Sequence, residues 1–247
     1  MHSDNTPSSL AANNTDSLRK ELLGISQHQQ RQELHSELNA TAQDLVAIPA
    51  QLSHLVLLSE RQWIDQERKL LSELCEHYNI ALPNCHENEF TVNLDELQLK
   101  WERHTEYSTY TIYQTGSFET PFDNPPIRRL PHKWLARLPG EILVATHIAL
   151  DDRSRPKRSL SELAQLFSSN TVIGSKVAGG SASVWSDNQI HEDGFGRILI
   201  HDENLRSRQI GRLVQRLLEI ETYRMLAMLP LPITRQMIPQ LARAEHL

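Results

Sequence analysis

The candidate chemistry of this chain lies in histidines and glutamates that fall within or beside predicted strands and helices. Glu102 and His104 share one face of a predicted strand, and this Glu-x-His spacing can chelate a metal ion. His147 interrupts an otherwise apolar strand, and His191 stands beside an Asp-Gly turn. If the elements converge on one sheet face, the three histidines are the candidate ligands of a divalent metal. Glu221 and Glu102 are then the candidate acid–base residues.

A structural interpretation competes for each of these residues, and the patterns favour it. Glu221 lies within the apolar stripe of the longest predicted helix, and Arg224 follows three residues later on the same side. An ionised carboxylate in an apolar setting is costly unless it is paired, hydrogen-bonded or bound to metal. We therefore expect a Glu221–Arg224 ion pair. His147 is expected to be a neutral, hydrogen-bonded core imidazole, and Asp193, near His191, is explained as a turn former.

Composition and motifs exclude several classes of protein. The sequence has no Gly-rich phosphate loop followed by Lys-Ser/Thr, no His-Glu-x-x-His, no Cys-x-x-Cys and no Gly-x-Ser-x-Gly. A net charge of −6 gives no argument for nucleic acid or an anionic membrane. Cys75 and Cys85 suggest neither a disulfide framework nor a metal site, so a reducing cytosol is expected. The basic cluster within 153–158 is expected to be a solvated loop.

The sheet that must position these residues is predicted by a change of hydrophobic period from 3.6 to 2 near residue 96. Residues 96–104 alternate between apolar and polar, and 107–114 are rich in β-branched and aromatic side chains, so the two segments form a hairpin or one long bent strand. Further strands are predicted at 53–58, at 141–150, and in a meander of 171–178, 183–190 and 196–201 with turns at Gly179-Gly180 and Asp193-Gly194.

Helices are predicted around this sheet and beyond it. An amphipathic helix covers 59–78, and a short helix follows Ser159, which forms a capping box with Glu162. The long helix 207–229 is expected to stop at Pro230 and Pro232. Other helical segments are predicted at 18–38 and at 234–246, the latter interrupted by Pro239.

The predicted fold is α+β, with a largely antiparallel sheet of five to seven strands, helices packed on one face and a long C-terminal helix. We expect a disordered tail at 1–17, an α+β domain at 18–232 and the start of a C-terminal helical extension at 233–247. The longest apolar runs, 142–150 and 225–233, are far shorter than the roughly 20 residues that span a bilayer.

Several sequence motifs occur in a fixed order, and together they make a resemblance to one family specific. They are LKWERHTEYSTYT at 99–111, LPGE at 138–141, VAGG at 177–180, and the stretches 191–197 and 211–224. With these, the chain from about 53 to 241 resembles the bacterial family known as domain of unknown function 3422 (DUF3422), whose members are described as predicted membrane-anchored proteins. The resemblance supplies no reaction. It implies this α+β domain, followed by a coiled-coil segment and a hydrophobic hairpin in the membrane.

Two departures from the family pattern matter. Members usually carry Asn-Glu-Leu-His-Ala-Arg-Pro before the first strand, whereas this chain has SELNATA at 36–42 and lacks the His, Arg and Pro. Any activity that depends on that motif is therefore expected to be lost. The chain also ends at Leu247, before the implied coiled coil, so membrane attachment is expected only through segments absent from it.

Two functions from different classes follow. The first is a non-catalytic cytoplasmic domain of a membrane-associated assembly or regulatory protein, anchored at the inner membrane where a longer natural chain exists. It would bind protein partners or its own copies through the C-terminal helix. The alternative is a hydrolase-like metal-dependent or acid–base enzyme that uses the His/Glu cluster. A small-molecule sensor is the third possibility.

Overall fold

The computed structural model describes residues 30–31, 47–81 and 88–244. The chain divides into two compact units, Met1–Ala42 and Gln43–Leu247, and the architecture below belongs to the second. The predicted tail at 1–17 lies outside the described residues, as does nearly all of the predicted helix at 18–38.

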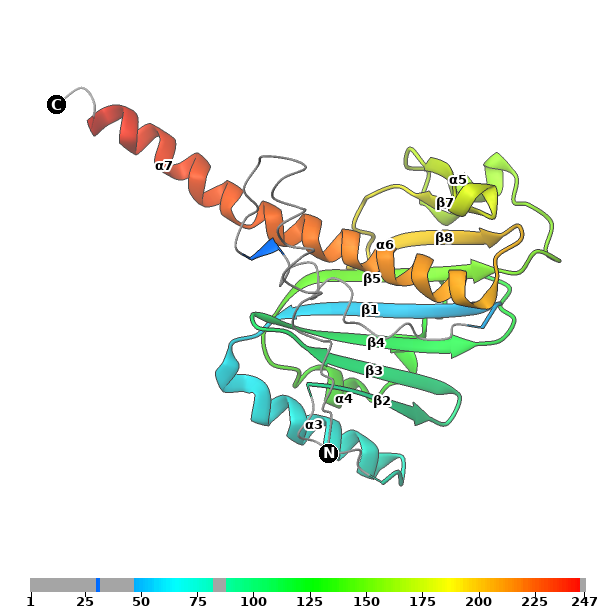
Figure 1. Ribbon diagram of the computed structural model, residues 1–247, viewed down its shortest axis with the longest axis horizontal. Coiled ribbons are helices and arrows are strands. Elements are labelled where there is room, and N and C mark those ends of the chain that lie inside the picture. The colour runs from blue at the N-terminus through cyan, green and yellow to red at the C-terminus, as the bar shows by residue number, and fades with distance from the viewer. Residues whose placement is uncertain (1–29, 32–46, 82–87, 245–247) are drawn as a thin grey trace, which may run out of the picture. The chain divides into compact units, whose positions relative to one another are not determined.

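The second unit is built on one mixed sheet of eight strands (Figure 1). The strands are β1 (Ala50–Leu58), β2 (Glu89–Leu94), β3 (Leu97–Arg103), β4 (Tyr107–Thr115), β5 (Glu141–Asp151), β6 (Ile173–Val177), β7 (Ala182–Ser186) and β8 (Gly196–Asp202). Their order is β2-β3-β4-β1-β5-β8-β7-β6, and every pair is antiparallel except β5–β8. The α+β class is confirmed, as are the hairpin of β3 and β4 and the β6–β8 meander.

The sheet has one strand more than the upper limit of the prediction. The unpredicted strand is β2, in which Phe90, Val92 and Leu94 alternate with polar residues. This alternation is a valid strand signal, because successive side chains of a strand point to opposite faces.

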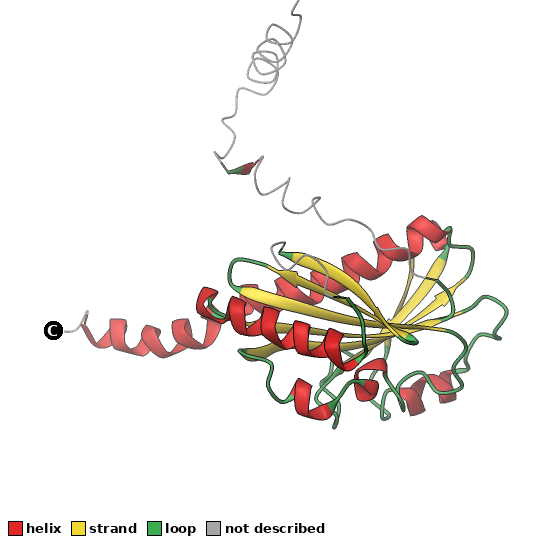
Figure 2. Ribbon diagram, turned by 90° about the horizontal axis from the view of Figure 1, so that it is seen from below, coloured by secondary structure: helices red, strands yellow, loops and turns green. Residues whose placement is uncertain are grey.

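Helices cover both faces of the sheet, not one face as predicted (Figure 2). The described helices are η1 (Arg61–Trp63), α3 (Ile64–His77), η2 (Pro126–Arg129), α4 (His132–Leu135), α5 (Leu160–Leu166), η3 (Ala178–Gly180), α6 (Ser207–Met228) and α7 (Pro230–Ala244). Central strand β1 explains the difference, because its side chains are apolar on both sides. Leu55 and Leu57 pack in the cluster that contains α3, whereas Leu52 packs in the cluster that contains α6.

The long helix ends before Pro230, as predicted, but the next helix begins at Pro230 and not at Thr234. Helix α6 ends at Met228, and α7 begins at Pro230 and includes Pro232 and Pro239 (Figure 1). Proline is tolerated at the first helical position, because the N–H that it lacks has no partner in the helix and its fixed φ suits the helix. The chain therefore continues as a second helix.

No helix among the described residues is both long and apolar enough to cross a membrane. The longest of them, α6, buries Ile210, Val214 and Leu218 against the sheet and carries arginines on its other side. It is a helix that closes a core.

Candidate functional site

Glu67 on α3 is an acidic residue whose side chain is fully buried. Four side chains donate hydrogen bonds to its carboxylate. The hydroxyls of Ser59 and Ser108 each lie 2.6 Å from it, Trp101 Nε1 lies at 3.2 Å, and Arg103 Nη1 lies at 3.3 Å. A buried charge is tolerated when it is paired and all its lone pairs are satisfied, and Glu67 meets that condition.

Arg103 links this network to the backbone. Its Nη2 donates to the carbonyl of Ser59 at 2.7 Å, and its Nη1 donates to Ser108 Oγ at 2.9 Å. The WERHTEYS part of the sequence therefore converges on one carboxylate that lies more than thirty residues earlier in the chain. Sequence reasoning assigned Glu67 only to an amphipathic helix. The available signal was its position in that helix's apolar stripe, one turn before Leu70 and Leu71.

His147 is a buried core histidine in the middle of β5. Its Nδ1 lies 3.0 Å from Ser53 Oγ on the neighbouring strand, and its ring stacks on Phe195 with centroids 3.9 Å apart. On the other side, Nε2 lies 3.8 Å from Asp193 Oδ2. Burial lowers the pKa of His147 to about 4, against the opposing effect of Asp193, so the imidazole is neutral near pH 7.

Ser53, His147 and Asp193 thus lie in a line that resembles a nucleophile–base–acid series, but the serine is completely buried. Its hydroxyl also accepts a hydrogen bond from the backbone N–H of Ile127 at 3.3 Å. A serine nucleophile must reach a substrate carbonyl, and this one is part of the core packing between β1 and η2. The arrangement acts as a structural tie.

His191 forms a second buried tie in the loop between β7 and β8. Its Nε2 lies 3.0 Å from Asp187 Oδ2, and its Nδ1 lies 3.2 Å from Ser168 Oγ, which follows α5. Asn170 donates a further hydrogen bond to Asp187 at 2.7 Å. These contacts attach the loop to the end of α5.

His104 and Glu102 lie on the other face of the sheet from His147. The ring of His104 stacks on Tyr107 at 4.3 Å, and Tyr107 belongs to the cluster that includes side chains of α6. Glu102 is 3.2 Å from Lys100 Nζ. His147 lies in β5 and His104 directly follows β3, but their side chains are on opposite faces of the sheet and are therefore separated by it. Within the described ranges, no three His, Cys, Asp or Glu side chains come together in a way that could hold a metal ion.

This face carries one more buried histidine, His54, whose Nδ1 lies 2.9 Å from Thr111 Oγ1. Burial lowers its pKa to about 3, and electrostatic interactions with His104 and Lys100 act in the same direction. His54 is therefore a second core imidazole that stays neutral near pH 7.

Glu221 lies at the margin of α6. Its Oε2 accepts a hydrogen bond from Arg224 Nη2 at 2.8 Å, and the Glu221 side chain is 20% exposed. Arg224 also reaches Asn188 in the β7–β8 loop, with Nη1 3.4 Å from Oδ1. The expected i, i+3 contact is thus present, and it connects α6 to the same loop that His191 anchors.

The basic cluster at 153–158 lies in a largely exposed loop, as predicted, and its cations are also paired with acidic side chains. Asp151, at the end of β5, is 2% exposed and receives both Arg155 and Arg158. Arg153 pairs with Asp202, and Lys157 pairs with Glu203. The pairs of Arg153 and Lys157 could not be predicted from the sequence, because β8 brings Asp202 and Glu203 beside the loop only in the folded sheet. These cations hold the loop and are not a free basic patch.

Among the described residues, large apolar side chains are exposed along one side of the C-terminal helix. Leu229, Ile233 and Met237 recur every four residues and are 41%, 61% and 50% exposed. At 100° per residue they form a stripe within an arc of about 80°. The four hydrophobic clusters of the described residues contain no side chain from α7. We call these three residues, Leu229 directly before α7 and Ile233 and Met237 within it, the α7 stripe.

Comparison with known families gives one result that covers most of the chain. The profile of the family described as "Protein of unknown function (DUF3422)" matches residues 26–247. Comparisons with curated proteins and with solved structures found no match.

Proposed function

The chain belongs to that family of unknown function, and we propose that it is a non-catalytic interaction domain that associates with a second copy of itself through the α7 stripe. The sheet domain is the folded base in this proposal, and α6 carries the chain from the sheet into α7. The observation that carries the proposal is the row of large apolar side chains on a helix that no described cluster covers.

The length and composition of α7 indicate that the helix needs a partner surface to be stable. Helix α7 has 15 residues, and isolated helices of about 12–15 residues are marginal in water. Two internal prolines lower its intrinsic stability further. Most helical stability in proteins comes from packing of an apolar face, so α7 requires a surface that covers Leu229, Ile233 and Met237.

A second copy of the chain is the partner that best fits this stripe. Apolar residues at intervals of about one helical turn allow two identical helices to bury the same face against each other, as in a two-fold interface. Arg235 stands on the opposite side of the helix, so the interface contains no buried charge from that position.

The polar residues singled out from the sequence support a structural role. Glu221 contacts Arg224, Glu102 contacts Lys100, His147 contacts Ser53, and His191 contacts Asp187. Each of these groups has a partner within the fold and therefore an adequate reason to exist without catalysis.

We also propose a cytoplasmic location, with this domain as part of a membrane-associated assembly. The buried thiol of Cys75 forms no disulfide, which fits a reducing compartment. Fractionation of cells that express the tagged natural protein tests this location. Recovery from an extracytoplasmic compartment would contradict it.

Sedimentation velocity of the purified chain over a range of concentrations tests self-association. The wild type is expected to shift from monomer to dimer as its concentration rises. Ile233→Asp places a charge in the centre of the α7 stripe and is expected to weaken dimerisation at least about tenfold, the equivalent of about 1.4 kcal/mol.

Arg235→Gln is the matched control, because it changes the net charge by the same amount on the other side of α7. It should dimerise like the wild type. A wild type that stays monomeric at every concentration, or equal dimerisation of both variants and the wild type, would remove the basis of the proposal.

A further inference from the structure

One edge of the sheet has an exposed strand with open space beside it. In the sheet, β6 is the terminal strand and pairs only with β7. Its residues Ile173 to Lys176 are all exposed, and Ile173 retains 59% of its accessible surface. An edge strand presents a row of unpaired N–H and C=O groups, which is a template for one further strand.

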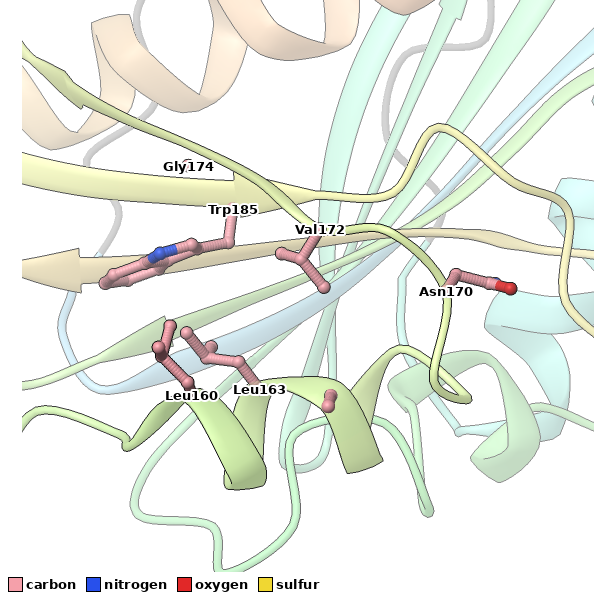
Figure 3. A pocket seen from close by; sticks show the side chains of 7 residues that line it. Leu160, Leu163, Asn170, Val172, Gly174 and Trp185 are labelled. Carbon is pink, nitrogen blue, oxygen red and sulfur yellow. The ribbon is translucent and has the colours of Figure 1, made fainter.

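An apolar cavity of about 390 Å³ lies next to this edge (Figure 3). Its walls are Leu160, Leu163 and Ala164 of α5, together with Asn170, Val172, Gly174 and Trp185. Ligand pockets in proteins start at about 300 Å³, so this cavity has room for one large side chain. Leu160 is 86% exposed, so its side chain is accessible to a partner.

Gly174 opens the cavity toward the edge. A Cβ at this position would lie 2.7 Å from Trp185 Cδ1, so the indole of β7 occupies the space of the missing side chain on β6 (Figure 3). The tryptophan therefore extends across the edge strand, opposite Leu160 and Leu163 on α5. No side chain of residue 174 separates the cavity from a strand added at the edge.

From these observations we infer that β6 and the cavity form a binding site for an extended peptide segment of a partner protein. The peptide would pair its main chain with β6 as a ninth strand, and one large apolar or aromatic side chain would enter the cavity between Trp185 and Leu160. Main-chain hydrogen bonds give such strand addition its affinity, and side-chain pockets give it specificity.

A second copy of β6 fits this site less well. On the cavity face, β6 offers only Gly174 and Lys176, and neither fills an apolar space of this size. An exposed lysine on an edge strand also disfavours self-pairing. A peptide with alternating side chains and a large apolar residue satisfies both the edge and the cavity. The site is separate from the α7 stripe and does not depend on it.

Panning of random peptides displayed on phage against the immobilised full chain tests this inference. Enriched peptides are expected to share one large apolar or aromatic position within an otherwise alternating sequence. A synthetic copy of the best peptide should slow hydrogen exchange of the amides of Ile173–Val177. Leu160→Asp should weaken its binding at least about tenfold.

Because Leu160 is almost fully exposed, Leu160→Asp should remain folded. The matched control is Ile142→Asp, at an apolar position that is 65% exposed and does not line the cavity. It should bind the peptide like the wild type. Failure to enrich any peptide, protection of β2 instead of β6, or equal binding by Leu160→Asp would each overturn the inference.

Discussion

At the scale of single residues, the best-supported feature is the buried carboxylate of Glu67. It neutralises Arg103 and accepts hydrogen bonds from three further donors, which lie in β3, in β4 and directly after β1. A group with that many partners fixes the position of α3 relative to the sheet.

Glu67→Gln should therefore destabilise the protein strongly. The amide keeps the shape of the side chain but leaves Arg103, whose side chain is 4% exposed, as a buried charge without its counter-ion. Breaking such a pair costs about 3–5 kcal/mol, measurable by urea unfolding. Glu73→Gln is the control on the same helix, because Glu73 pairs with Arg137 at the surface and should matter little. Equal midpoints for the two variants would show that the Glu67 network is not a major source of stability.

The buried histidine His147 predicts how stability depends on pH. Its pKa is lowered to about 4 in the folded state, mainly by burial, whereas an exposed histidine titrates near 6.5. Between these values the unfolded chain binds more protons, so stability falls as pH falls through this window. The contribution from His147 amounts to about 3 kcal/mol between the two limits.

Urea unfolding of the wild type and His147→Gln on both sides of this window isolates that contribution. The variant should lose less stability than the wild type when the pH is lowered from 7 to 4.5. Parallel pH dependences would mean that His147 is accessible to protons in the folded state.

Part of this residue-level description could be predicted from the sequence. An imidazole inside an apolar strand indicated a buried neutral histidine, and the i, i+3 spacing indicated the contact between Glu221 and Arg224. The partners of Glu67 and Asp202 could not be predicted, because they come from segments that only the sheet order brings together.

At the scale of elements, tight turns position the central strands. Gly140 precedes β5 with φ +97°, and a Cβ there would overlap the carbonyl oxygen of Leu58 on β1. Gly116 follows β4 with φ +125°, but a Cβ there would have no neighbour within 4 Å. A substitution at Gly116 therefore tests backbone strain alone. A substitution at Gly140 tests the same strain together with a steric overlap.

Gly140→Ala should cost about 2 kcal/mol more than Gly116→Ala, because only the first substitution adds a backbone clash to the unfavourable φ. Thermal unfolding of the two variants measures the difference. Equal losses would indicate that the β1–β5 edge can shift to accept the methyl group.

Local signals predicted most elements well. Alternation identified β3, and β-branched and aromatic composition identified β4. The capping box located the start of α5, where both of its hydrogen bonds are present. The start of α7 was predicted four residues too late, because a proline that follows the end of one helix can equally be the first residue of the next. The side of the sheet that each helix covers could not be inferred, since β1 is apolar on both faces.

At the scale of the whole molecule, the central claim is that α7 is completed by α7 of a second copy. The candidate polar residues of the sheet unit have partners within the fold, whereas Leu229, Ile233 and Met237 remain uncovered. A helix of this length and composition should be only partly formed in a monomer and well formed in a dimer.

Hydrogen exchange of the α7 amides, Pro230–Ala244, at low and high protein concentration tests this claim most directly. We predict weak protection in dilute protein, and protection that rises in step with the dimer fraction from sedimentation, while the amides of β1 and β5 exchange equally slowly at both concentrations. Protection of α7 that does not change with concentration would contradict the claim.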